Sequence, residues 1–220
     1  VPSWQEQGPA GNDPGYDGNQ DGVPDSQQDN AASLPAFSGD YVTVACGESL
    51  ALQNVAALDN PSPGDAPAGA VMPYGFFDFQ VADLTVGGAI VVDIHVPDGS
   101  AVNSYWKYGP TPDNAASHWY EFSFDGATGA VIDGNVIHLY FVDGLRGDDD
   151  LLANGRITEP GAPAFLDEVP PAAPVIPWIT MLSPSASIIA FCTVPRTSIL
   201  PAALTSKLSC SLPAIITDPR

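Results

Sequence analysis

The residues with the clearest ligand spacing form the segment Asp17-Gly18-Asn19-Gln20-Asp21-Gly22-Val23-Pro24-Asp25. Counted from Asp17, side-chain oxygens stand at positions 1, 3, 5 and 9, and a glycine stands at position 6. This spacing is typical of a calcium loop, in which the glycine makes a sharp turn and position 7 offers its backbone carbonyl. We therefore expect the following residues to bind Ca²⁺: Asp17, Asn19, Asp21, Val23 and Asp25, with Asp29 completing the shell.

The four acids at positions 17, 21, 25 and 29 have no cation between them, so they repel one another unless a divalent ion binds among them. Position 12 of the loop is Gln28 where an EF-hand has a bidentate Glu, and no amphipathic helix precedes Asp17. A helix-loop-helix hand is therefore not expected. For a calcium loop we expect a dissociation constant for Ca²⁺ of roughly 0.1 to 1 mM. The alternative is a solvated acidic linker that binds no ion.

A second group of oxygens follows Gly147. Asp148, Asp150, Asn154 and Glu159 are close enough in sequence to surround another calcium ion. The alternative is a charged loop capped by hydrogen bonds.

Aromatic residues suggest a different kind of site. Trp106, Tyr108, Trp119 and Tyr120 could form a platform for the faces of sugar rings, as in a carbohydrate-binding module. Aromatic side chains of a small sandwich are more often part of its core, because each buries a large apolar area. Their exposure to solvent distinguishes the two.

Motifs of catalysis are missing. The sequence has no Gly-x-Ser-x-Gly elbow, no His-Glu-x-x-His and no phosphate-binding glycine loop. His95, His118 and His138 fall on predicted strands, where a histidine most often lies on a sheet face. Asp78 and Asp93 would form a carboxylate pair only if the fold brought them together. We expect no enzymatic activity.

The elements that must position these residues are short strands. Runs rich in Val, Ile, Tyr, Phe and Trp alternate with turn signals such as Asp133-Gly134. Seven such runs predict an all-β fold, an antiparallel β-sandwich of the immunoglobulin-like or jelly-roll-like kind. The runs are Tyr41 to Cys46, Leu50 to Ala56, Phe76 to Ala82, Ala89 to Val96, Ser104 to Tyr108, His118 to Phe124, and Val136 to Val142.

Alternation within the runs predicts which side chains are buried. In Ala89 to Val96 the apolar face carries alternate residues from Ile90 to Val96, opposite Asp93 and His95. We expect the core to contain Phe77, Phe79, Val92, Ile94, Phe122, Ile137, Leu139 and Phe141.

Composition divides the chain into three parts: an irregular Asp/Gly-rich calcium-binding linker (1–37), the sandwich (38–165), and a Pro-rich apolar tail (166–220). The longest uncharged, Pro-free piece of the tail is Ser185 to Val194, shorter than the ~20 apolar residues of a membrane-spanning helix. The three cysteines are not a disulfide framework. Cys192 and Cys210 could pair across a loop, or all three thiols could be free.

Charge restricts the partners. The formal net charge is −20, and no Lys or Arg precedes Lys107. This excludes nucleic acid and anionic membranes as partners and favours cations.

Two segments resemble known families. The Asp-rich loop is similar to calcium repeats of the thrombospondin type 3 kind. The motifs Met72-Pro73-Tyr74-Gly75-Phe76-Phe77-Asp78-Phe79, Tyr105 to Asn114, His118 to Phe122, Phe141 to Asp150 and Ala153 to Ile157 together resemble the choice-of-anchor U domain, over about residues 38 to 164. That resemblance implies a bacterial exported module, extracellular or at the cell surface, with no catalytic residues. The resemblance implies no defined ligand. Our own expectation is a structural or adhesive role, with a cell-envelope polysaccharide or a surface protein as partner. The tail shows no LPxTG motif, so the resemblance does not assign an anchor.

Overall fold

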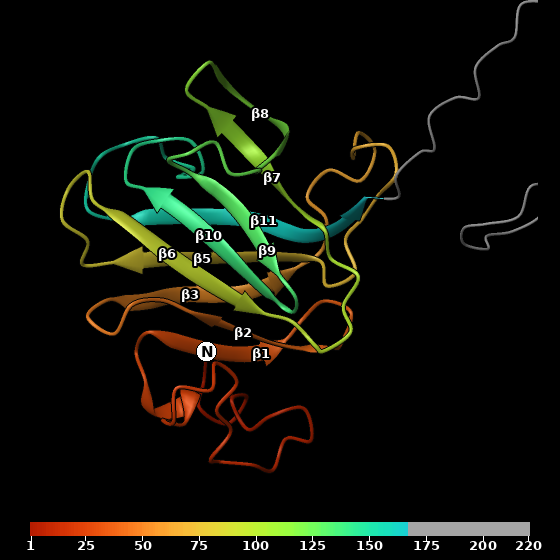
Figure 1. Cartoon of the computed structure of the whole chain (residues 1–220), viewed down its shortest axis with the longest axis vertical. Helices are drawn as coiled ribbons and strands as arrows, with labels where there is room; N and C mark the ends of the chain where they lie inside the picture. The colour runs from red at the N-terminus through yellow and green to blue at the C-terminus, as the bar shows by residue number, and fades with distance from the viewer. Residues whose placement is uncertain (167–220) are drawn as a thin grey trace, which may run out of the picture. The chain divides into compact units, whose positions relative to one another are not determined.

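The computed structural model describes residues 1–166, which contain eleven β-strands and one short 3-10 helix (Figure 1). The elements are η1 (Asp25–Gln27), β1 (Ala31–Pro35), β2 (Tyr41–Ala45), β3 (Ala51–Leu58), β4 (Ala70–Val71), β5 (Phe76–Ala82), β6 (Ala89–His95), β7 (Ser104–Thr111), β8 (Asn114–Glu121), β9 (Gly129–Asp133), β10 (Val136–Val142) and β11 (Ile157–Leu166).

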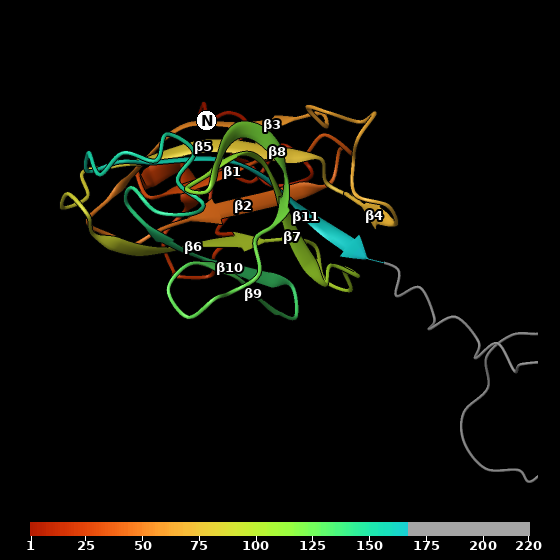
Figure 2. The same cartoon turned by 90° about the horizontal axis from the view of Figure 1, so that it is seen from above.

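The strands form two sheets, and every pair of named strands is antiparallel. The first sheet has the order β1-β2-β6-β10-β9, and the second has the order β3-β5-β11-β7-β8 with β4 attached to β11. Figure 2 shows them as two layers, with β3 and β5 in one and β6 and β10 in the other. The chain is thus a β-sandwich, and the predicted fold class is confirmed.

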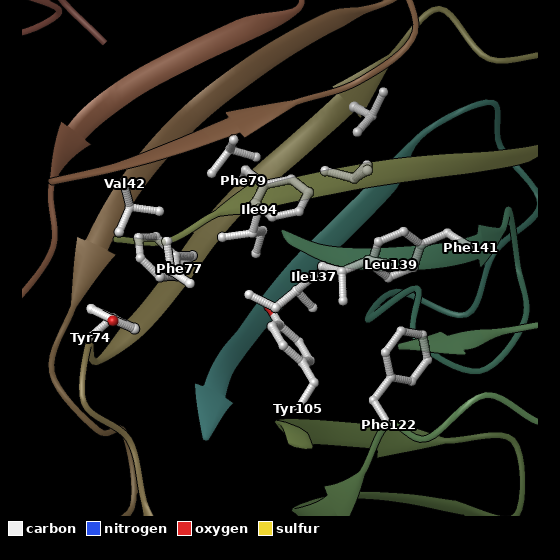
Figure 3. Packing of buried hydrophobic residues seen from close by; sticks show 14 of the residues in the cluster. Val42, Tyr74, Phe77, Phe79, Ile94, Tyr105, Phe122, Ile137, Leu139 and Phe141 are labelled. Carbon is white, nitrogen blue, oxygen red and sulfur yellow. The ribbon is translucent and has the colours of Figure 1, made fainter. Parts of the chain in front are cut away.

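The core lies between the two sheets and is built from alternate residues of the strands (Figure 3). All eight side chains that the sequence places in the core are at most 1% exposed. Phe122, which follows β8, stacks on Phe141 of β10 with ring centroids 5.4 Å apart. Each such side chain contributes roughly 1.5 to 3 kcal/mol through removal of its apolar surface from water.

All seven predicted strands are present, and the structure adds β1, β4, β9 and β11. β11 contains Pro160 and Pro163, and its sequence gave no strand signal. The strand pairs with β5 from Ile157 to Gly161 and with β7 from Gly161 to Ala164. Each proline therefore has a ladder on one side only, which is the place in a sheet where a residue without an N–H is tolerated.

The boundary predicted at residue 38 is too late. β1 falls in the predicted irregular linker because its small residues, Ala-Ala-Ser-Leu-Pro, give no clear alternation. In the structure β1 pairs along its whole length with β2. Ala31, Ala32 and Ser33 of β1 are buried, and the Ser33 hydroxyl donates to Asp25 of the N-terminal segment.

The predicted tail after Leu166 and the suggested Cys192–Cys210 pair lie outside the described residues. Cys46 is a half-buried free thiol, and burial raises its pKa to about 12. Between residues 1 and 166 the structure has no helix with the length and apolar character needed to cross a membrane.

Candidate calcium loop and a buried lysine–carboxylate cluster

The N-terminal segment is attached to the β1–β2 edge of the first sheet (Figure 1). Asp25 is fully buried, and its Oδ2 accepts hydrogen bonds from the Gly18 N–H at 3.0 Å and from the hydroxyl of Ser33 on β1. The hydroxyl of Tyr41 on β2 donates to the carbonyl of Gln5. The acidic loop therefore has a fixed place on the sandwich.

Within the loop, carboxylates accept the N–H groups of residues further along. Asp17 accepts from Asp21 at 3.2 Å and from Gly22 at 2.8 Å, and Asp21 Oδ1 accepts from Val23 at 2.8 Å. Gly22 has φ of 94°, the left-handed conformation that the glycine at position 6 was expected to supply. The bond from the Val23 N–H lowers the pKa of Asp21, which keeps this carboxylate ionised at neutral pH.

Two of the predicted ligands converge on one side chain, Gln28. Its amide nitrogen donates to Asp21 Oδ1 at 3.1 Å and to the Val23 carbonyl at 3.0 Å. A half-turn of the amide exchanges its nitrogen for its oxygen with almost no change of shape. In the sequence Gln28 is a departure from the EF-hand pattern, but the structure places its amide beside two of the predicted ligands.

The predicted ligands Asp25 and Asp29 differ from each other. Asp25 Oδ1 is buried and has no hydrogen-bond partner, and burial, with smaller contributions from the charges of Asp17 and Asp21, raises the pKa of Asp25. Asp29 is exposed and lines a cavity of about 200 Å³ with Glu6 and Leu52. The structure thus associates Asp25 with the loop, whereas Asp29 lines a separate cavity.

Among residues 1–166 there is no group of three or more His, Cys, Asp or Glu side chains arranged as a metal site. The candidate ligands are instead two carboxylates, one or two amide oxygens and a carbonyl, the hard oxygen donors that Ca²⁺ accepts. Asn19 and Asp21 also line a cleft of about 400 Å³ that continues to Asp93 and His95 on the outer face of β6. The loop is therefore open to ions from solvent.

The predicted second calcium cluster does not assemble. Asp148 accepts the N–H groups of Thr158 at 3.0 Å and Gly144 at 2.9 Å, and Asp150 accepts from Leu152 and from Asn154. Glu159 points into the core instead. The alternative given for this segment, a charged loop capped by hydrogen bonds, describes Asp148, Asp150 and Asn154.

Asp143 organises the same loop. It is 2% exposed and accepts the N–H groups of Gly87 at 2.7 Å, Asn154 at 3.1 Å and Gly155 at 2.8 Å. Burial by itself would raise the pKa of Asp143, but these backbone donors together outweigh it, and the pKa is lowered.

We expect Asp143→Ala to reduce the free energy of unfolding by about 2 kcal/mol at pH 7, because it leaves backbone donors without an acceptor. A carboxylate with a lowered pKa stabilises the fold above the pKa of the unfolded state, about 3.9, and this contribution is lost as the pH falls toward the folded value. The difference from wild type in urea unfolding should therefore shrink below about pH 4. Asp59→Ala, at an exposed acid, is the control; equal losses for the two variants would contradict the role of Asp143.

The four predicted platform aromatics do not share a plane. Tyr108 of β7 and Trp119 of β8 are cross-strand partners whose half-buried rings are tilted by 57°, and Trp119 also packs edge-on against the buried Phe76. The indole nitrogen of Trp106 is buried. Tyr120 is paired with Lys107 on the opposite, inward face. The proposed flat sugar-binding surface is therefore not formed.

Asp78 and Asp93 also stay apart. Their strand neighbours Phe77, Phe79, Val92 and Ile94 face the core, so the two acids lie on the outer faces of different sheets. On the outer face of the first sheet, Asp93 pairs with His138 of β10 at 2.7 Å. His95 is half-buried, and burial lowers its pKa.

The structure shows one polar group that was not predicted from the sequence: an ion pair inside the core. Lys107 of β7 and Glu159 of β11 are both fully buried and in direct contact. The Lys107 Nζ lies 5.5 Å from the ring centroids of both Phe122 and Phe141. The hydroxyl of Tyr105 donates to Glu159 Oε1 at 2.9 Å.

Two further side chains belong to this group, which we call the buried lysine cluster (Tyr105, Lys107, Tyr120, Asp149 and Glu159). Asp149 Oδ1 and the Tyr120 hydroxyl are buried without hydrogen-bond partners. Burial raises the pKa of both Asp149 and Glu159, and the positive charge of Lys107 opposes the rise in each. A buried charge is stable only when it is paired, so the cluster is an electrostatic unit.

No family model, curated protein or solved structure matches the chain. Its function must therefore be inferred from the geometry of the calcium loop and of the buried lysine cluster.

The sequence indicates the buried lysine cluster only weakly. Lys107 shares its strand face with Tyr105, because the two are separated by one residue, and a lysine on an inward face needs a buried acid. The sequence did not identify Glu159 as that acid, because β11 was not predicted and Glu159 was therefore assigned to a loop.

Proposed function

We propose that the protein is an exported, non-catalytic structural or adhesive module of the bacterial cell surface, with an N-terminal loop that is stabilised by calcium. The observation that carries the calcium part is the loop, where Asp21 Oδ1 and the Val23 carbonyl converge on the Gln28 amide. Beside it the Asp25 carboxylate is fully buried, and its Oδ1 has no hydrogen-bond partner. Such an oxygen is costly unless a cation or a proton satisfies it. Export and surface location rest on the choice-of-anchor U resemblance.

A bound ion would join the loop to the sandwich. Asp17, Asn19, Asp21, the Val23 carbonyl and a rotated Gln28 amide are the ligands from the loop, and Asp25 contacts both Gly18 and Ser33 of β1. Calcium would offset the mutual repulsion of the acids and hold the N-terminal segment over β1, an edge strand. Covered edges protect a secreted sandwich from pairing with other chains.

We expect 10 mM CaCl₂ to raise the melting temperature of the wild-type chain by roughly 3 to 10 °C relative to chelator. For a dissociation constant of about 0.1 to 1 mM, the gain is RT ln(1 + [L]/Kd), or about 1.4 to 2.7 kcal/mol. A domain of this size gains about 2 to 4 °C per kcal/mol. Thermal unfolding followed by circular dichroism, with MgCl₂ at the same ionic strength as reference, measures the effect.

Two variants make the experiment specific. Asp17→Asn combined with Asp21→Asn should abolish the response to calcium, whereas Asp98→Asn, at an exposed acid remote in sequence, should keep it. Identical melting of the wild type with calcium and with chelator would remove calcium from the proposal. Since the four aromatic rings form no common surface, a carbohydrate-binding function is not proposed.

A further inference from the structure

The contact between Lys107 and Glu159 brings a primary amine against a carboxyl group in a place closed to bulk solvent. Both side chains have 0% exposure, and the Lys107 Nζ is covered by the rings of Phe122 and Phe141. Lysine and glutamate are almost never fully buried, and replacing such a pair by apolar residues often leaves a protein equally stable. Stability alone therefore does not explain the pair.

An amine and a carboxylic acid held in contact can condense. We propose that Lys107 and Glu159 form an intramolecular amide bond between the Lys107 Nζ and the Glu159 Cδ, which links β7 to β11 covalently. Fixing the two groups side by side replaces a bimolecular encounter, and a desolvated lysine is an effective nucleophile once it loses its proton. Burial of the pair also keeps bulk water away from the amide and so protects it from hydrolysis.

The reaction balances with the groups present. A proton passes from the ammonium to the Glu159 carboxylate, and the free amine attacks Cδ. Asp149 takes the second proton from the nitrogen and returns it to the departing oxygen, so that one water molecule leaves and Asp149 is regenerated. Lysine and glutamate thus become an amide and water, with no oxidant or activating cofactor.

The neighbouring groups suit this chemistry. Tyr105 donates to Glu159 Oε1, while Lys107 contacts Oε2. The negative charge of the tetrahedral intermediate therefore develops on an oxygen that already has a donor, and Oε2 is the oxygen that leaves. Burial raises the pKa of Glu159 and favours its protonated form, the one that an amine attacks.

Two glycines make room for the acids. A Cβ at Gly161, the cross-strand partner of Lys107, would clash with Glu159 Oε1 and the Tyr105 ring. A Cβ at Gly109, two residues from Lys107 on the same face, would clash with Asp149 Oδ1. This oxygen has no hydrogen-bond partner and lies beyond ion-pair distance of the Lys107 Nζ, so its role as proton carrier requires that Asp149 move toward the nitrogen.

Mass spectrometry of the intact full-length chain tests the proposal directly. The expected mass is that of the sequence minus one water molecule. A tryptic digest should lack cleavage after Lys107 and contain residues 1–146 joined to residues 157–196, because Lys107, Arg146, Arg156 and Arg196 are the first cleavage sites. A chain with the full sequence mass and normal cleavage after Lys107 would overturn the proposal without any variant being made.

Lys107→Arg is the control for other losses of water, since Asp-Gly sequences can also lose water by forming succinimides. Arginine keeps the positive charge beside Glu159 but is not a nucleophile, so this variant should have its full sequence mass. Loss of one water molecule from Lys107→Arg to the same extent as from wild type would assign the loss elsewhere and overturn the proposal.

Asp149→Asn tests the proton carrier. We expect it to slow formation of the amide by about a hundredfold or more, seen as a slow loss of water after purification. Asp150→Asn, at the exposed neighbour, should form the amide at the wild-type rate. Equal rates in the two variants would overturn the role given to Asp149.

Discussion

Glu159→Leu is expected to lower the free energy of unfolding by about 3 to 5 kcal/mol, because it leaves the Lys107 ammonium buried without its counter-charge. Both side chains of the pair are fully buried. Leucine is close to glutamate in volume, so the loss should come from the unpaired charge rather than from a cavity. Urea unfolding followed by tryptophan fluorescence measures it.

The matched control is the double variant Lys107→Met with Glu159→Leu. Apolar residues of similar volume often replace a buried ion pair at little cost, so the double variant should be more stable than Glu159→Leu by about 3 kcal/mol or more. Neither variant can form the amide, which makes their comparison independent of the crosslink. If the double variant were as unstable as Glu159→Leu, the unpaired charge would not be the cause.

Phe79→Ala is expected to cost about 3 to 5 kcal/mol, the usual penalty for removing a fully buried aromatic ring. Phe79 has 0% exposure, lies on β5 and belongs to the same core cluster as Ile94 (Figure 3). The cost has two parts, the lost transfer of the ring from water and the cavity that remains. Denaturant unfolding at pH 7 gives the difference from wild type.

Phe37→Ala provides the comparison for a ring of the same type at the surface. Phe37 is 58% exposed, so its removal should change the free energy of unfolding by about 0.5 kcal/mol. Similar losses for Phe37→Ala and Phe79→Ala would mean that burial between the two sheets does not determine the stability of this sandwich.

The sequence predicted the parts of the fold that have strong alternation. β6 and β10 alternate apolar and polar residues, and their inward faces were correct residue by residue. β1 and β11 were missed for a different reason, since small residues and prolines carry no alternation and are placed in strands only by their neighbours. Tertiary pairing, which a single sequence does not show, decided these two strands.

The candidate sites also differ in whether local sequence or tertiary pairing brings their residues together. The calcium loop could be predicted because its candidate ligands are close in sequence, from Asp17 to Asp25, and calcium binding there stays a prediction. The buried lysine cluster was not, since Lys107 and Glu159 are brought together only by the pairing of β7 with β11. The second calcium cluster was wrong because proximity in sequence does not determine direction: Glu159 faces the core while Asp150 faces solvent.

The position of β11 also affects how the sandwich responds to a pulling force. Tension applied at Leu166 enters the second sheet through a strand that lies between β5 and β7. The ladder to β5 covers the first half of β11 and the ladder to β7 the second half, so the load along the strand is shared by hydrogen bonds on both sides. When the force acts along β11, these bonds are loaded in shear and must break together rather than one by one.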